Sequence, residues 1–394
     1  MKIKRVYIGG WFQRTTLHLS EIYDFLIDGT SSVSLDEHKL LDLKKKLHIK
    51  SADLKVKGFE HISISTKEEL SLKVFEDGLI VLRNDFEEGD DLANDIKELT
   101  NYYEQKLSPA FSYLFSLGAP IPKELANIKT VYPYFVILED ATRSEIIELL
   151  AKFKQKKYFE ITNNRFELFR GDKFYIINTK EESLDAVERF IEEQIFLREF
   201  KGQLHRYLNL HRIIWERIAE VKEKGSIKGK EVGVFKNKVD GYAKTINLIE
   251  TRINQMGAYL HTRESIAKND VDLKSFGDVL EYRYEALLNT HAYLKEIWVM
   301  TKNYVDSSLK LFSDLQAKAT QSSVENLTIV TSMGVGATII GLFTTDSVPQ
   351  FTTFGATYFI ILAAVGYMAK KTTTWFYARK SYTISDIEYD TRIE

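Results

Sequence analysis

Two long stretches without charge near the C-terminus constrain this chain most. Between Glu325 and Asp346 lie 20 residues, NLTIVTSMGVGATIIGLFTT, and between Asp346 and Lys370 lie 23 more, SVPQFTTFGATYFIILAAVGYMA. A helix of 20 residues rises about 30 Å, which matches the hydrocarbon core of a bilayer. Helices of soluble proteins rarely lack charge on every face over such a length. The pattern therefore predicts two transmembrane helices, joined as a hairpin within residues 326–370.

The charges that flank this hairpin predict its orientation. Lys370, Lys371, Arg379 and Lys380 follow the second stretch, whereas the loop 344–350 contains no Lys or Arg. By the positive-inside rule, both termini face the cytoplasm and the loop faces outside. The N-terminus MKIKRVYIGGWF has no apolar run, so we expect no cleaved leader. We expect a multi-pass protein of the inner (cytoplasmic) membrane, with residues 371–394 as a cytoplasmic tail.

Small and hydroxylated residues recur at steps of three and four along the first predicted span. They are Thr331, Gly334, Thr338, Gly341 and Thr345. Such a stripe suits close packing against another helix, and it equally suits the lining of a pore. Two helices per chain cannot enclose a pore. Both interpretations therefore require a homo-oligomer.

A seven-residue repeat precedes the first span. Its two sets of positions are Leu273, Leu280, Leu287, Leu294, Thr301, Ser308, Leu315 and Tyr284, His291, Trp298, Val305, Phe312. This seam is typical of coiled-coil packing, and we expect it to need identical neighbours, with His291 as an interface residue. No proline occurs between Pro133 and Pro349, so one helix of about 70 residues can run on into the membrane. Helices over 200–223 and 236–266 complete a helical stalk, residues 200–325.

Residues 1–199 have the pattern of an α+β cytoplasmic domain. Strands are predicted by KRVYIGGWFQ, HISIST, LSLKVF, GLIVLRNDF, VYPYFVIL, KYFEITN, RFELFRG and KFYIIN, and helices over about 89–106 and in SEIIELLAKFKQ and SLDAVERFIEEQIF. We interpret Gly9-Gly10 as a turn or bulge. Two parts, 1–126 and 127–199, are distinguishable, and the pattern leaves open whether they share a sheet.

Composition and motifs exclude several functions. The formal net charge is -2 and there is no Cys, which argues against nucleic-acid partners, thiolate metal sites and cysteine nucleophiles. No phosphate loop, dinucleotide fingerprint, zinc spacing or nucleophile elbow occurs, so we expect no enzyme and no certain cofactor. His205 and His211 are six residues apart, off the step that places two ligands on one helix face.

Two basic runs are weak candidates for contact with a small anionic ligand, although such runs are usually solvated. One is Lys44, Lys45 and Lys46 in the first part of the domain. The stronger candidate comprises Lys152, Lys154, Lys156, Lys157, Arg165 and Arg170.

The segment LKLFSDLQAKATQSSVENLTIVTSMGVGATIIGLFTTDSVPQ, with Lys370-Lys371 after the second span, resembles the CorA family of magnesium channels over about residues 270–372. The resemblance implies a funnel of five chains, in which a cytoplasmic α/β domain precedes a stalk helix and two C-terminal spans; a tetramer is the alternative. The family's Gly-Met-Asn signature, which selects Mg²⁺ at the pore mouth, should follow Gly341. Here the chain reads LFTTD, so the pore mouth would be Thr344, Thr345 and Asp346.

Divergent CorA-like proteins without this signature occur beside type III CRISPR systems, where they look like effectors switched by a nucleotide second messenger. The missing signature leads us to favour that class: an ion-conducting pore gated by its cytoplasmic domain and used in antiviral defence. A divalent cation (magnesium) transporter is the first alternative. A membrane scaffold that conducts no ions is the second.

Overall fold

The computed structural model describes residues 1–12, 18–56, 59–87, 89–115, 133–162, 165–179 and 183–343, and within 357–384 it describes 357, 360–361, 364–368, 371–372, 375 and 379–384. These residues form two compact units. The first is Met1–Leu208 with Leu248–Lys295, and the second is Asn209–Asn247 with Glu296–Glu394.

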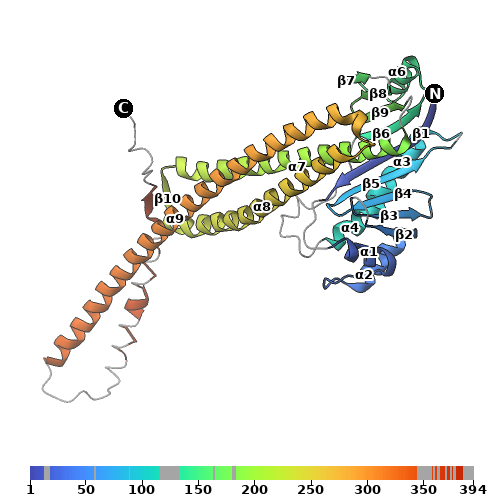
Figure 1. The fold of residues 1–394 in the computed structure, drawn as a ribbon. Coiled ribbons are helices and arrows are strands. Elements are labelled where there is room, and N and C mark those ends of the chain that lie inside the picture. Colours follow the sequence, from blue (N-terminus) through green and yellow to red (C-terminus); the bar gives the residue numbers. More distant parts are fainter. Residues whose placement is uncertain are drawn as a thin grey trace, which may run out of the picture. The chain divides into compact units, whose positions relative to one another are not determined.

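A mixed sheet of nine strands organises the first unit (Figure 1). The strands are β1 (Lys2–Trp11), β2 (Ile49–Lys55), β3 (His61–Thr66), β4 (Ser71–Phe75), β5 (Leu79–Asp85), β6 (Tyr134–Glu139), β7 (Phe159–Thr162), β8 (Phe166–Arg170) and β9 (Phe174–Thr179). Their order is β2-β3-β4-β5-β1-β6-β9-β8-β7. Within this sheet, β6 and β9 pair in parallel and the other neighbours pair antiparallel.

The two parts that the sequence pattern distinguished share this one sheet. They meet where β1 pairs with β6, with Val6 opposite Val136. Strand β1 thus lies at the centre, between strands drawn from before residue 86 and after residue 133.

One face of the sheet carries the main hydrophobic core. Alternate strand residues such as Val6, Ile8, Leu82 and Val136 point into it, as expected from the two-residue period of a strand. The helices on this face are α1 (Leu19–Asp28), α2 (Glu37–Lys46), α3 (Leu92–Tyr102) and α4 (Ser108–Leu114), with a π-helical turn (Tyr103–Leu107) between the last two, and α6 (Arg143–Lys152).

The opposite face receives α7 (Leu184–Glu223). Trp11 at the end of β1 packs on Phe196 and Phe200 of α7, with ring centroids 5.5 Å apart in each case. Gly9 allows this approach, because a Cβ there would lie 2.5 Å from the Ile80 carbonyl oxygen and 3.0 Å from Ile195 of α7. The expectation of a turn or bulge at Gly9-Gly10 is therefore wrong: both residues lie within β1, and close packing explains Gly9.

Three long helices connect the two units along the chain. Helix α7 runs unbroken through residue 200, α8 spans Gly229–Asn269, and a 3-10 turn (Lys274–Phe276) leads into α9 (Gly277–Phe343). Helix α9 has 67 residues, close to the expected 70. Strands β10 (Ser226–Lys228) and β11 (Ser381–Thr383) form a small second sheet.

The predicted heptad seam is buried along its whole length. The exposure of its twelve side chains ranges from 0% at Leu294 to 7% at His291. The partners include helices of the same chain: His291 Nε2 is 2.6 Å from the Ile253 carbonyl oxygen of α8, and Phe312 stacks on Phe235. Burial within one chain means that the seam no longer argues for identical neighbours, and only the stripe on the predicted first span still does.

The two predicted spans fall largely outside the described residues. The backbone of α9 covers residues 326–343, and within that range side-chain surroundings are described for Thr328, Thr331, Gly334 and Val335. Among the parts of the chain that the structure describes, no helix is long and apolar enough to cross a membrane.

Candidate functional site

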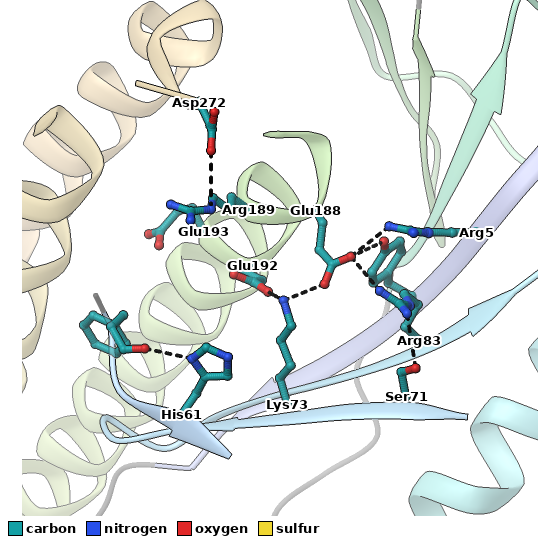
Figure 2. A network of polar contacts seen from close by, with 12 residues as sticks. Arg5, His61, Ser71, Lys73, Arg83, Glu188, Arg189, Glu192, Glu193 and Asp272 are labelled. Atoms are coloured by element: carbon teal, nitrogen blue, oxygen red, sulfur yellow. Dashed lines mark hydrogen bonds and ion pairs between the residues drawn. The ribbon is translucent and has the colours of Figure 1, made fainter. Parts of the chain in front are cut away.

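A network of charged side chains joins the sheet to α7 in the first unit (Figure 2). Its centre is Glu188, which is 8% exposed. The carboxylate accepts hydrogen bonds from Arg5 at 3.0 Å, Arg83 at 2.9 Å and the Tyr7 hydroxyl at 3.1 Å, and Lys73 lies 2.6 Å away. Four donors from three neighbouring strands thus converge on one carboxylate.

The strand register explains this convergence. Arg83 lies opposite Tyr7 on β1 and opposite Ser71 on β4, so their side chains share the sheet face that α7 covers. Lys73 is two residues beyond Ser71 and bridges Glu188 and Glu192, which are one helical turn apart on α7. The strands supply the cations and the helix supplies the carboxylates.

The charges set the protonation state of this network. Burial acts to raise the pKa of Glu188, but Lys73 and Arg83 outweigh burial and hold the pKa at about 2. Burial likewise acts to lower the pKa of Lys73, and Glu192 and Glu188 raise it. Glu188, Lys73 and the two arginines are therefore charged near neutral pH, which suits a fixed joint and offers no general base for catalysis.

A second, deeper network ties the same unit to α8 and α9. Arg263 of α8 is 2% exposed, and its guanidinium forms a two-point contact with Asp77, which is 1% exposed, in the turn between β4 and β5. Its Nη1 also donates to Glu193 of α7 at 2.8 Å. The Tyr284 hydroxyl near the start of α9 donates to the other oxygen of Glu193.

Aromatic rings and pKa shifts complete this second network. The Arg263 guanidinium lies 4.4 Å from the ring centroid of Phe59 and 4.5 Å from that of Phe196, a contact that stabilises a desolvated cation. Burial acts to lower the pKa of Arg263, whereas Asp77 and Glu193 raise it above its ordinary value. Burial raises the pKa of Glu193. The sheet and all three long helices meet at this point.

The basic run predicted as a ligand surface does not form a comparable cluster. Lys157 pairs with Glu160 at 3.0 Å, Lys152 lies 3.8 Å from Asp91, and the Arg170 guanidinium lies over the rings of Phe159 and Tyr175. Lys154 sits in the turn after α6, Lys156 follows two residues later, and Arg165 directly precedes β8.

Only one member of this run lines a described cavity. That cavity, of about 680 Å³, includes Lys152 beside Asp90, Asp91, Glu145 and Glu148. Such an acidic lining disfavours an anion, so the ligand role of the run stays a prediction with little support from its surroundings.

The predicted pore residues are described only in part. Thr331 and Gly334 lie on α9, and Thr331 is exposed. Thr338 and Gly341 belong to the same helix, but their side-chain surroundings, together with Thr344, Thr345 and Asp346, lie outside the described residues. The described residues contain no group of three or more His, Cys, Asp or Glu side chains that could hold a metal ion.

The sequence interpretation missed both charged networks. For the network around Glu188, the sequence did contain a signal. Basic residues interrupt the otherwise apolar strands at Arg5, Lys73 and Arg83. In the apolar helix AVERFIEEQIF, Glu188 and Glu192 are four residues apart and so share one face. Arg263 gave no such signal, because its partners Asp77 and Glu193 lie 186 and 70 residues away in the chain.

Comparisons with known proteins found no match by sequence and only low-scoring matches by structure. No family model matches the chain, and no curated protein matches it. The complete structure of the CorA magnesium transporter from Methanocaldococcus jannaschii is 8% identical, with a TM-score of 0.30, over 64% of this chain and 95% of that one. The soluble domain of CorA from the same organism is 9% identical, with a TM-score of 0.16, over 43% and 86% of the two chains. Scores and identities this low do not establish a shared fold.

Proposed function

We propose that this chain assembles with identical copies into an ion-conducting pore in the cytoplasmic membrane, and that its cytoplasmic domain opens the pore when a nucleotide second messenger binds. The antiviral role of type III CRISPR effectors is the setting that we propose for it. The observation that carries the proposal is the continuity of α9, which runs from Gly277 to Phe343 without a break.

The two ends of α9 belong to different environments. Near its start, Tyr284 is 1% exposed and bonded to Glu193 of α7. Its last 18 residues, 326–343, belong to the first uncharged stretch. At about 1.5 Å per residue the helix is roughly 100 Å long. A continuous helix of this kind can carry a displacement of the cytoplasmic domain to a pore.

The energetic demand of gating favours several identical sites. A ligand must prefer the open state by about 5.5 kcal/mol to move a pore from 1% to 99% open. One charge-assisted hydrogen bond contributes roughly 1.5–3 kcal/mol. Several sites acting on one ring can supply the difference together.

Single cysteines test the topology and the pore, because the chain contains no Cys. In intact spheroplasts, a membrane-impermeant maleimide should label Asp346→Cys and leave Lys371→Cys unlabelled. In proteoliposomes, a thiol reagent should block ion flux through Thr338→Cys on the stripe. Ile340→Cys is the matched control, because two residues along a helix turn the side chain by about 200°, and its flux should persist.

The outcomes separate the alternatives. Equal labelling of positions 346 and 371 would refute the hairpin. Insertion without any flux would favour the scaffold, and flux that responds only to magnesium withdrawal would favour the transporter.

A further inference from the structure

A cavity of about 470 Å³ lies among α7, α8 and α9 within the second unit, close to the turn that joins α7 to α8. Its volume falls in the range of small-molecule sites. We call it the turn cavity. It is lined by Arg217, Ile218, Glu220, Val221, Lys224, Phe235, Lys238, Val239, Tyr242 and Phe312.

The turn cavity has an apolar floor and a basic rim. Ile218, Val221, Val239 and Phe312 are each at most 5% exposed and form the floor. Three cations and one carboxylate form the rim, and all four residues are exposed: Arg217, Lys224, Lys238 and Glu220. The division into apolar floor and cationic rim suits a molecule that carries an anionic group on an apolar body.

The rim cations are available for such a group. Among the described residues, none of the three lies within ion-pair distance of a carboxylate. Arg217 approaches the Tyr242 hydroxyl at 3.4 Å, and the Lys238 ammonium lies 5.4 Å from the centroid of the Phe235 ring. Exposed amines and a guanidinium in this state can bind a phosphate without first giving up an ion-pair partner.

Backbone pairing places the C-terminal tail beside the same turn. Strands β10 and β11 pair with Ile227 opposite Tyr382. The Gly229 amide donates to the Lys380 carbonyl oxygen at 3.0 Å, and the Ile384 amide donates to the Gly225 carbonyl oxygen at 2.9 Å. Residues 380–384 are thus joined to the turn between α7 and α8.

This pairing limits how far the turn lies from the second uncharged stretch. Lys380 is nine positions after Lys371, which corresponds to roughly 14 Å if helical and about 30 Å if fully extended. Within that segment, the Arg379 guanidinium lies 4.0 Å from the centroid of the Trp375 ring. Trp beside basic residues is typical of the membrane interface. If the proposed hairpin inserts, the turn cavity lies near the cytoplasmic headgroups.

We propose that the turn cavity binds the phosphate headgroup of an anionic membrane lipid, with Arg217, Lys224 and Lys238 as its ligands and the apolar floor against the lipid's glycerol and upper acyl region. This inference rests on the membrane insertion proposed above and adds a lipid site to it. The cytoplasmic leaflet is the one whose anionic lipids attract basic residues near the surface. Because Phe312 belongs to α9, the bound lipid contacts the same helix that we propose as the gating rod.

Native mass spectrometry of the full-length protein with added phosphatidylglycerol or phosphatidylcholine tests the site. Each basic residue near an anionic surface contributes about 1 kcal/mol, roughly fivefold in affinity, so the triple variant Arg217→Gln, Lys224→Gln, Lys238→Gln should bind phosphatidylglycerol on the order of 100-fold more weakly. Lys50→Gln, Lys55→Gln, Lys67→Gln removes the same charge from exposed positions of the first unit and should bind like the wild type. Binding of phosphatidylcholine should be weaker than that of phosphatidylglycerol and alike in all three proteins.

Three outcomes would overturn the lipid site. The first is equal affinity of both triple variants for phosphatidylglycerol, and the second is binding of phosphatidylcholine as tight as that of phosphatidylglycerol. The third is full displacement of the lipid by soluble glycerol phosphate, which would mean that the cavity recognises a free phosphate. A melting curve of each variant shows whether it is folded. Cysteine labelling that confirms insertion while the lipid result is negative would refute the lipid site and leave the pore proposal standing.

Discussion

At the scale of single residues, Arg263 is the side chain whose removal should matter most for stability. Arg263→Met leaves Asp77 and Glu193 buried without their cation, and removing one partner of a buried ion pair typically costs about 3–5 kcal/mol. Chemical unfolding of the full chain in detergent should show a loss of that order. Arg212→Met is the control: Arg212 lies 3.6 Å from Glu216, both are exposed, and the change should stay within about 0.5 kcal/mol. Equal stability of the two variants would contradict the role of the Arg263 network.

The lowered pKa of Glu188 predicts that the protein loses stability in acid. The pKa of its carboxyl is lowered from 4.5 to about 2, so the folded state binds this proton more weakly than the unfolded state. The resulting stability, on the order of 3 kcal/mol, is present above about pH 4.5 and is lost as the pH falls toward 2. The gap in unfolding free energy between wild type and Glu188→Gln should therefore narrow over that window. A gap that stays constant with pH would show that Glu188 is not paired as described.

At the scale of elements, the contact between α8 and α9 depends on a glycine. A Cβ on Gly257 would lie 2.7 Å from Cε1 of His291, which is held by the Ile253 carbonyl oxygen. Ala normally stabilises a helix interior by about 0.5–1 kcal/mol relative to Gly. Gly257→Ala should instead destabilise the protein, whereas Gly241→Ala on the same helix, where a Cβ has nothing within 4 Å, should stabilise it by that amount.

A double variant separates the steric effect from the helix effect. In a His291→Ala background the clash is gone, so Gly257→Ala should recover the ordinary gain. Thermal unfolding of the four proteins checks this cycle, and a gain from Gly257→Ala in the wild-type background would contradict the packing of α8 on α9.

Much of the element pattern could be predicted from the sequence. Seven-residue spacing and the absence of proline predicted α9, and alternation predicted all strands of the large sheet except β2. Strand β2 was missed because IKSADLK has one buried residue, Ala52, and therefore no alternating apolar pattern. Helix α2 was missed because EHKLLDLKKK buries only Leu40 and Leu43, and in that short polar helix the basic run dominated the interpretation.

The candidate site was harder to predict than the fold. Local patterns reveal which residues are apolar, but not which strands become neighbours. Arg5, Lys73 and Arg83 meet because β4, β5 and β1 are adjacent in the sheet, and that order depends on pairing over long sequence distances. The buried ion pair of Asp77 likewise could not be predicted, since an acidic residue in a turn is ordinarily solvated.

At the scale of the whole molecule, we expect a ring of identical chains. Native mass spectrometry of the full chain in detergent should give four or five copies, because the stripe from Thr331 to Thr345 needs helices of other chains once it is in lipid. The buried heptad seam predicts in addition that α7, α8 and α9 keep their mutual packing in a monomer. A monomer or simple dimer as the largest species would refute the pore.

The carboxylate of Asp346 should determine how strongly such a ring attracts cations. A ring of carboxylates at a pore mouth concentrates cations without recognising one hydration shell. Asp346→Asn should therefore lower cation flux and leave the oligomer unchanged by native mass spectrometry. The wild-type chain should not rescue a magnesium-transport-deficient strain as completely as an ordinary CorA protein does. Complete rescue would show that the pore mouth does select magnesium.

The central claim is that the cytoplasmic domain controls a pore, and cation flux from liposomes containing the full-length oligomer tests it most directly. We expect little flux from the protein alone and a large increase on addition of a nucleotide second messenger, tried as a panel of cyclic oligonucleotides. Thr338→Cys treated with a thiol reagent should abolish that increase. Flux that ignores every nucleotide and rises only when magnesium is withdrawn would contradict the account, and so would the absence of flux under all conditions.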